Sequence, residues 1–152
     1  MLCPPAATGV NNVPLSLKWM LVYEEPETRT LWLGKATPRD WLAAGEAPLL
    51  VRNATTRYGR ISFSLAVVTD QCYTVRASVT LPPAFATSAP AGGLRLRVRA
   101  PLEHAGKLSA VRVGGTAWGD FDAGAETVDF SAAQLAGAMA GGGLLSIVAT
   151  FA

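Results

Sequence analysis

The chain has 152 residues, of which 50% are apolar and 16% charged, so it is long enough to bury one core and too apolar for a disordered chain. Its 13 basic and 11 acidic residues are scattered and give a net charge of +2, which excludes the basic face of a nucleic-acid-binding protein. No apolar run reaches the roughly 20 residues that span a bilayer. We therefore expect one globular domain that binds neither nucleic acid nor a membrane.

The N-terminal residues predict a flexible tail over 1–14, because prolines and glycine there oppose both a helix and a central strand. This segment lacks the basic and apolar regions of a signal peptide. Residues 15–23 form a dense apolar run that fits either a helix or a strand buried on both faces. The folded domain is expected to cover residues 15–152.

The first half of the domain predicts strands at 29–34 and 49–52 with a capped helical turn between them. Thr37 is placed as the N-cap, Pro38 as the first helical residue and Gly45 as the end, with Trp41 and Leu42 sealing one end of the core. Residues 53–58, NATTRY, favour a turn. Residues 60–68 then alternate apolar and polar side chains, the pattern of a half-buried strand.

The second half continues in the same way, with a loop at 84–93 and a short helix at 131–139 that Ser131 caps. Gly114 and Gly115 suit a two-residue hairpin turn, because both can take positive φ. Further strands are expected at 72–81, 94–99, 108–113, 127–130 and 144–151. The fold class is therefore all-β: an antiparallel β-sandwich of about eight strands with one or two short helical segments.

Candidate binding residues are aromatic and basic. Arg95, Arg97 and Arg99 alternate along one strand and form either a solvated face or a surface for an anionic ligand or carbohydrate. The tryptophans are expected in the core or in a sugar-stacking platform, and Trp118 is the best candidate for exposure because it follows a turn. The remaining tryptophans are Trp19, Trp32 and Trp41.

Acidic and other reactive residues give weaker signals. Asp120 and Asp122 flank a phenylalanine in a glycine-rich turn, where Asp is favoured for bonding to the backbone; calcium ligation and paired-carboxylate catalysis are the alternatives. His104 is expected on a surface loop. Cys3 and Cys72 could pair, but they predict neither a disulfide framework nor a metal site. We expect no catalytic residue, metal or cofactor in this chain.

Asn53-Ala54-Thr55 satisfies the pattern for N-glycosylation. The pattern has meaning only in a protein secreted from a eukaryote. The residues also suit the corner that is predicted at 53–58. Asn53 is therefore a conditional modification site.

Three patterns carry a resemblance to a known family: a "P-x-x-W-L" turn, a "T-x-x-G-x-[IV]-S" strand entry and a "V-x-V-N-G-x-x-W-x-x-F-D" hairpin. The matching residues are Pro38, Trp41 and Leu42; Thr56, Gly59, Ile61 and Ser62; and Val111, Val113, Gly115, Trp118, Phe121 and Asp122. Gly114 stands where the third pattern has Asn. Over residues 15–130 the chain resembles the C-terminal β-sandwich accessory domain of six-hairpin glycosidases, whose catalytic domain is an (α/α)6 toroid, and of related carbohydrate-active enzymes.

This resemblance implies a non-catalytic accessory domain that packs on a toroid in the same or a neighbouring chain. It implies that residues 15–24 correspond to the end of the toroid's last helix. It also implies that the domain is exported only if it is part of a larger secreted glycosidase. The acid and base of such enzymes lie on the toroid, which this chain lacks. The alternatives are a free-standing carbohydrate-binding module that uses Trp118 and the arginine strand to bind a polysaccharide, and an autonomous hydrolase that uses Asp120 or Asp122.

Overall fold

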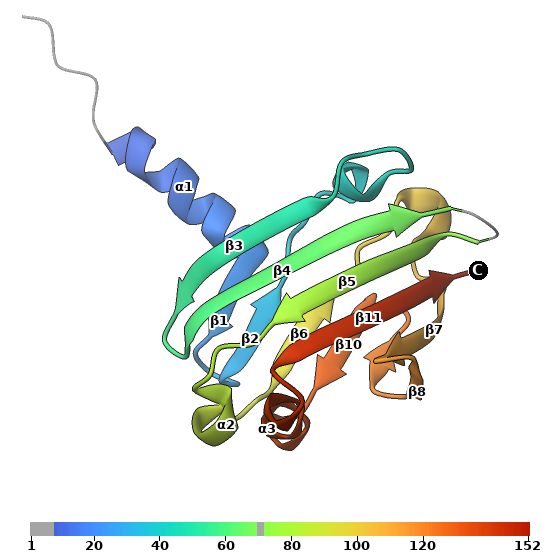
Figure 1. Ribbon diagram of the computed structural model, residues 1–152. Coiled ribbons are helices and arrows are strands. Elements are labelled where there is room, and N and C mark those ends of the chain that lie inside the picture. Colours follow the sequence, from blue (N-terminus) through green and yellow to red (C-terminus); the bar gives the residue numbers. More distant parts are fainter. Residues whose placement is uncertain (1–7, 70–71) are drawn as a thin grey trace, which may run out of the picture.

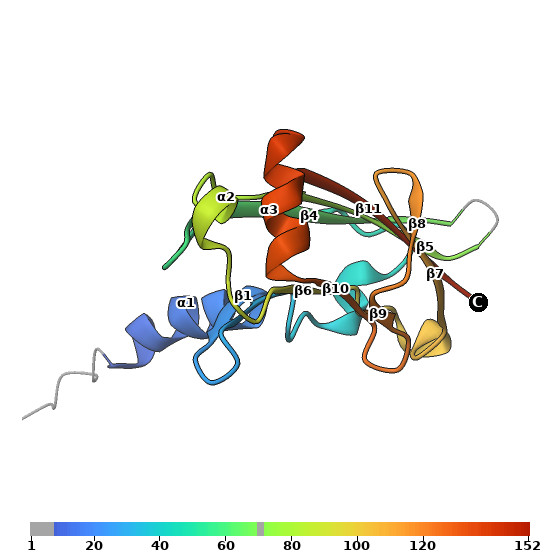
Figure 2. The same ribbon diagram turned by 90° about the horizontal axis from the view of Figure 1, so that it is seen from below.

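The computed structural model describes residues 8–69 and 72–152, with side chains for all of these except residues 8–12. Two β-sheets are stacked as layers, seen edge-on in Figure 2. In spatial order, the five-stranded sheet consists of β1 (Val22–Glu25), β2 (Thr30–Leu33), β6 (Leu94–Arg97), β10 (Thr127–Phe130) and β9 (Phe121–Asp122). The six-stranded sheet consists of β3 (Leu49–Thr56), β4 (Gly59–Val68), β5 (Thr74–Thr80), β11 (Leu144–Phe151), β7 (Leu108–Val113) and β8 (Thr116–Trp118).

The predicted β-sandwich is confirmed, with more strands than the eight expected. The strand pairs are antiparallel except for β2 and β6, which run parallel in the five-stranded sheet. The β7–β8 hairpin closes through Gly114 and Gly115, whose φ angles of 58° and 84° are those that the two-residue turn requires. The additional strands β1, β8 and β9 are short, and each lies at an edge of its sheet.

The core lies between the two layers, because every second side chain of a strand points inward. Ile61, Phe63 and Leu65 of β4 are buried as their alternation predicts, whereas Val67 is only partly buried. The facing sheet contributes the buried residues Leu31, Leu33, Leu94, Leu96, Val128 and Phe130. The core thus joins strands that are far apart in the sequence (Figure 1).

Short helices close the ends of the sandwich. α2 (Phe85–Ser88) and α3 (Ala132–Ala140) lie at one end (Figure 2), and they contribute the buried residues Phe85 and Leu135 to the core. Ser131 caps α3 as predicted: its hydroxyl accepts from the Gln134 amide, and the Gln134 side chain accepts from the Ser131 amide. Two 3-10 helices, η1 (Arg39–Leu42) and η2 (Leu102–His104), also lie in the connections between strands.

The N-terminal part departs from prediction. α1 (Thr8–Leu21) is a helix that includes Pro14, so the expectation that residues 1–14 hold no helix is wrong from Thr8 onward, and residues 1–7 lie outside the described residues. The apolar run at 15–23 is divided: it is helical to Leu21 and becomes β1 at Val22. Among the described residues, no helix has the length and apolar character needed to cross a membrane.

Two local predictions in the first half are also corrected. Thr37 does not cap η1, because its hydroxyl is buried and donates to the Gly34 carbonyl instead, leaving Pro38 at the cap position. Leu42 is buried but Trp41 is 39% exposed, so only Leu42 seals the core.

The predicted turn at 53–58 is wrong over most of its length, because β3 continues to Thr56. The register between β3 and β4 shifts between Val51 and Ala54, and Asn53 has φ of 52°, which marks a β-bulge. The chain turns only after Thr56, before β4 begins at Gly59.

Candidate functional site

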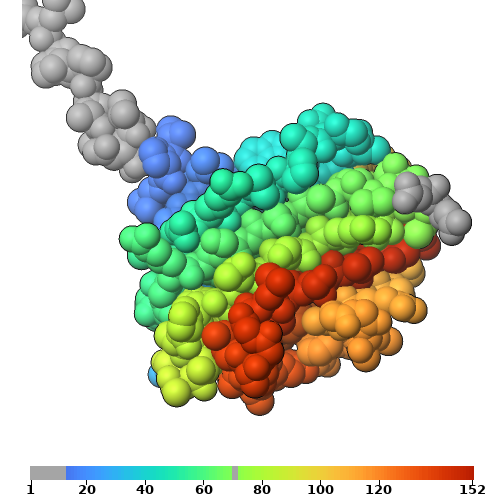
Figure 3. Space-filling view, viewed as in Figure 1, coloured from blue at the N-terminus to red at the C-terminus, as the bar shows by residue number. Residues whose placement is uncertain are grey.

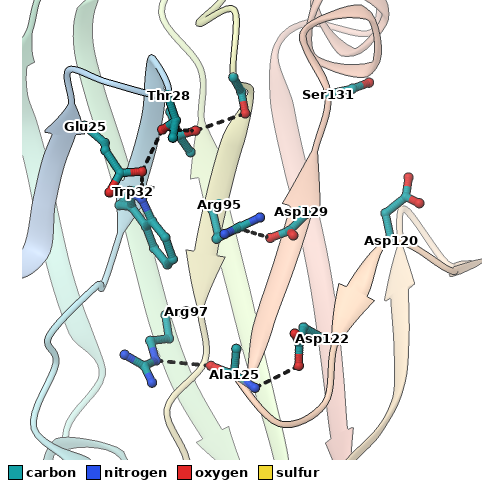
Figure 4. A network of polar contacts seen from close by, with 12 residues as sticks. Glu25, Thr28, Trp32, Arg95, Arg97, Asp120, Asp122, Ala125, Asp129 and Ser131 are labelled. Carbon is teal, nitrogen blue, oxygen red and sulfur yellow. Dashed lines mark hydrogen bonds and ion pairs between the residues drawn. The ribbon is translucent and has the colours of Figure 1, made fainter.

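The outer face of the five-stranded sheet carries a row of polar and aromatic side chains, which we call the outer row: Tyr23, Trp32, Arg95, Asp129 and Asp120. Strand register aligns the row, because Tyr23 pairs with Trp32, Trp32 with Arg95, and Arg95 with Asp129. The Asp129 amide then donates to the Asp120 carbonyl over 2.9 Å. Figure 4 shows these side chains from Trp32 to Asp120 lying next to one another across four neighbouring segments.

Charged groups hold the outer row together. Arg95 Nε lies 2.8 Å from Asp129 Oδ1, and the Arg95 guanidinium carbon lies 4.9 Å from the centre of the Trp32 ring. Lys35 Nζ lies 4.1 Å from the ring centre of Tyr23 and 4.9 Å from that of Trp32. Cations therefore contact both aromatic rings of the outer row, and cation–π attraction favours this arrangement.

Glu25 completes the network at the β1 edge. Its carboxylate accepts hydrogen bonds from the Thr28 hydroxyl, the Trp32 indole and the Lys35 ammonium. These bonds, with that of Thr28 the largest effect, hold the pKa of Glu25 below its usual value. The carboxylate therefore remains ionised and anchors Trp32 and Lys35.

A groove of about 550 Å³ opens at the other end of the outer row, between β6, β10, the turn before β9, and α3. Its lining combines an arginine, carboxylates and an amide with one partly buried aromatic ring. The lining side chains that carry these groups are Arg95, Asp120, Asp122, Asp129, Gln134 and Phe121. Gly92 and Gly119 contribute only backbone atoms to the wall of the groove.

The two predicted aspartates both line this groove. Asp122 Oδ1 accepts the Ala125 amide over 2.9 Å, which is the backbone bonding expected of an Asp in a turn. Asp120 Oδ2 accepts the Gln134 side-chain amide over 2.7 Å. In the described residues, no three His, Cys, Asp or Glu side chains are placed to hold a metal ion.

The structure separates the three predicted arginines. Only Arg95 reaches the groove. Arg97 donates to the carbonyls of Ala125 and Lys35, and Arg99 donates to that of Thr37. Burial, together with the neighbouring Arg99, lowers the pKa of Arg97. All three are partly exposed and alternate with the buried Leu94, Leu96 and Val98, as expected of the polar side of a strand.

The most exposed tryptophans are Trp19 and Trp41, and not Trp118 as predicted. Trp118 is half-buried: its ring lies 5.0 Å from that of Phe130, and its Nε1–H donates to the carbonyls of Asp120 and Asp129 beneath the groove. Trp19 is 53% exposed. Trp32 of the outer row was not singled out, although its position between the buried Leu31 and Leu33 signals an outward side chain.

A second surface is formed by α1, which stands out from the body (Figures 1 and 3). Its last turn is fixed, because the amides of Gly34 and Ala36 donate to the carbonyls of Leu21 and Met20 over 2.7 and 3.0 Å. The large apolar side chains that α1 exposes are Val13, Leu15, Leu17 and Trp19, which we call the α1 surface.

An apolar hollow of about 460 Å³ lies at the base of α1. Trp19 and Met20 form its wall on the helix side, and Tyr23, Lys35 and Arg97 come from the sheet and its connections. The hollow thus continues the α1 surface onto the edge of the five-stranded sheet, and Arg97 and Lys35 give it positive charge.

The remaining predicted residues lie away from both surfaces. Asn53 is exposed on the bulge of β3 in the other sheet. His104 lies in η2, where its ring stacks on Tyr73 with 4.4 Å between ring centres. Cys72 is exposed, and Cys3 lies outside the described residues.

No protein-family model matches the sequence, and a search of curated proteins also finds no match.

Proposed function

We propose that this chain is a non-catalytic β-sandwich accessory domain of a carbohydrate-active enzyme, which packs through α1 on a helical catalytic domain. The observation that carries this proposal is the α1 surface. Val13 is 70% and Trp19 53% exposed, on a helix whose end is bonded firmly to the sandwich. Exposed apolar side chains in such a group are typical of a surface that another domain covers.

The positions of these side chains indicate what covers them. Val13 and Leu17 are four residues apart and share one side of the helix, and Leu15 and Trp19 share another. The two pairs are offset by two residues, or about 200° around the helix axis. A helix that is apolar on opposite sides needs partners on both. A neighbouring helical domain supplies such partners, as α1 would then be one helix among several.

The length of α1 supports the same conclusion. It has 14 residues and includes Pro14, which removes one helical hydrogen bond. Isolated helices shorter than about 12–15 residues are marginal in water even without proline. Packing on a second domain would stabilise α1 by burying its apolar side chains.

The carbohydrate-active class comes from the three sequence patterns, which resemble the sandwich that follows the toroid in six-hairpin glycosidases. In that family the segment corresponding to α1 ends the last helix of the toroid. The toroid, with its catalytic acid and base, is therefore the proposed partner. Asp120 and Asp122 act in this chain as partners of Gln134 and of the Ala125 amide.

Calorimetric titration tests the proposal. The chain is titrated with the (α/α)6 domain that the proposal places upstream in the same reading frame or in a neighbouring gene. A variant with serine at the four positions of the α1 surface should bind at least about tenfold more weakly, because its apolar contacts are lost.

A matched control replaces exposed apolar residues of the body. Leu50, Leu102 and Leu144 are at least 55% exposed and lie outside α1, so a serine variant at these positions should bind as the original chain does. Equal binding by the α1 variant, or neighbouring sequence without any helical toroid, would contradict the proposal.

A further inference from the structure

We propose that the groove on the five-stranded sheet binds a short neutral oligosaccharide, with Arg95, Asp129 and Asp120 as the residues that contact its hydroxyl groups. This binding goes beyond the accessory role and does not depend on it. The volume of about 550 Å³ lies within the range of about 300–1,000 Å³ found for small-molecule sites. The groove is open on the outer face, so a saccharide can extend out of it.

The hydrogen-bonding groups in the groove match adjacent hydroxyls. Arg95 contacts Asp129 through Nε, so its two terminal nitrogens remain to donate, and a guanidinium donates to two oxygens side by side. Each of the three carboxylates uses one oxygen in a hydrogen bond within the protein: Oδ1 in Asp129 and Asp122, and Oδ2 in Asp120. The second oxygen of each carboxylate can accept a hydrogen bond from a hydroxyl group. A sugar hydroxyl both donates and accepts, as this mixed set requires.

The charge in the groove selects among saccharides. Three carboxylates face one guanidinium, so a saccharide that carries acidic groups would meet repulsion from Asp120 and Asp122. A neutral saccharide avoids this repulsion. Phe121 supplies an apolar surface for the C–H groups of a sugar ring.

Contacts within the protein hold the side chains of the groove. Trp32 holds the Arg95 guanidinium by cation–π contact and so acts as a positioning residue. Gln134 is held at both ends, since its side-chain oxygen accepts the Ser131 amide and its nitrogen donates to Asp120. Side chains that are already in place lose little freedom on binding, which favours affinity.

The stability of the fold does not by itself explain why Arg95 and Asp129 stand at these positions. The Arg95 and Asp129 side chains are 42% and 33% exposed, and ion pairs at such a surface contribute little to folding. Variants at these positions should therefore fold, which makes binding easy to test separately from stability.

The test is a nuclear magnetic resonance titration that follows the four indole N–H signals. Soluble neutral oligosaccharides of glucose, xylose, mannose and N-acetylglucosamine are added in turn. At least one series should shift the signals of Trp118, beneath the groove, and Trp32, beside Arg95, while those of Trp19 and Trp41 stay in place. Arg95→Ala and Asp129→Ala should each weaken binding at least about tenfold.

Controls separate this proposal from the accessory role. Arg57→Ala removes another exposed ion pair, that with Glu24, and should leave binding unchanged. The serine variant of the α1 surface should also bind the oligosaccharide normally. The proposal is overturned if none of the four series binds, if the two groove variants bind as well as the original chain, or if only acidic saccharides or basic peptides bind.

Discussion

At the scale of the residue, the charged pair of Glu126 and Arg39 holds one end of the sandwich. Glu126 is fully buried, and Arg39 Nη1 lies 3.0 and 2.9 Å from its two carboxylate oxygens. The Glu126 carboxylate also accepts the Gly106 amide, and Arg39 donates to the Ala100 carbonyl. The pair therefore ties η1 to the connections that precede β7 and β10.

Removing Arg39 should destabilise the domain strongly. Arg39→Ala leaves the Glu126 carboxylate buried without its cation, and we expect the free energy of unfolding to fall by about 3–5 kcal/mol. Urea denaturation followed by circular dichroism measures this change. The control is Arg57→Ala, whose exposed pair with Glu24 should contribute less than about 1 kcal/mol. Equal losses in the two variants would show that the buried pair has no special role.

At the scale of the element, the sequence correctly predicts the features that depend on interactions between residues close together in the chain. The alternation in β4, the Gly114–Gly115 turn and the Ser131 cap all depend on residues a few positions apart, and all are found. β9 was missed because a strand of two residues depends on its partner in the sheet, and the apolar run at 15–23 left open whether a helix or a strand precedes β2. The parallel β2–β6 pair joins segments about 60 residues apart, which no local pattern indicates.

The same limit applies to the groove. Asp120 and Asp122 were noticed as a pair in the sequence, but their neighbours Arg95, Asp129 and Gln134 come from other elements. Trp118 was chosen because it follows a turn, yet a hairpin turn folds it back onto Phe130. The register across β2, β6 and β10 brings the outer row together, and it follows from the tertiary fold.

The bulge in β3 gives a prediction at this scale. Asn53 has φ of 52°, a conformation that asparagine and glycine tolerate and β-branched residues resist. Asn53→Val should therefore lower the free energy of unfolding by about 1–2 kcal/mol, whereas Asn53→Gly should change it little. Arg52→Val, at the exposed preceding position, is the matched control and should be well tolerated in a strand. If thermal unfolding shows that Asn53→Val and Asn53→Gly are equally stable, the backbone at this position is not strained for a β-branched residue.

At the scale of the whole molecule, the two proposed surfaces lie at opposite edges of the five-stranded sheet. α1 leads into β1 at one edge, and the groove lies beside β10 and β9 at the other. A catalytic domain docked on α1 would therefore leave the groove open to a saccharide. The sandwich would hold both the enzyme and a segment of its substrate, which is how an accessory domain raises the local concentration of a polymer.

The central claim is that α1 is covered by a helical catalytic domain, and amide hydrogen exchange measures this most directly. The chain is compared alone and mixed with the toroid domain. We predict that exchange in residues 13–21 slows at least about tenfold in the mixture while the strands of the six-stranded sheet are unchanged, because burial and helix stabilisation oppose local opening. Unchanged exchange in α1, with protection that appears on the face of either sheet instead, would contradict the account.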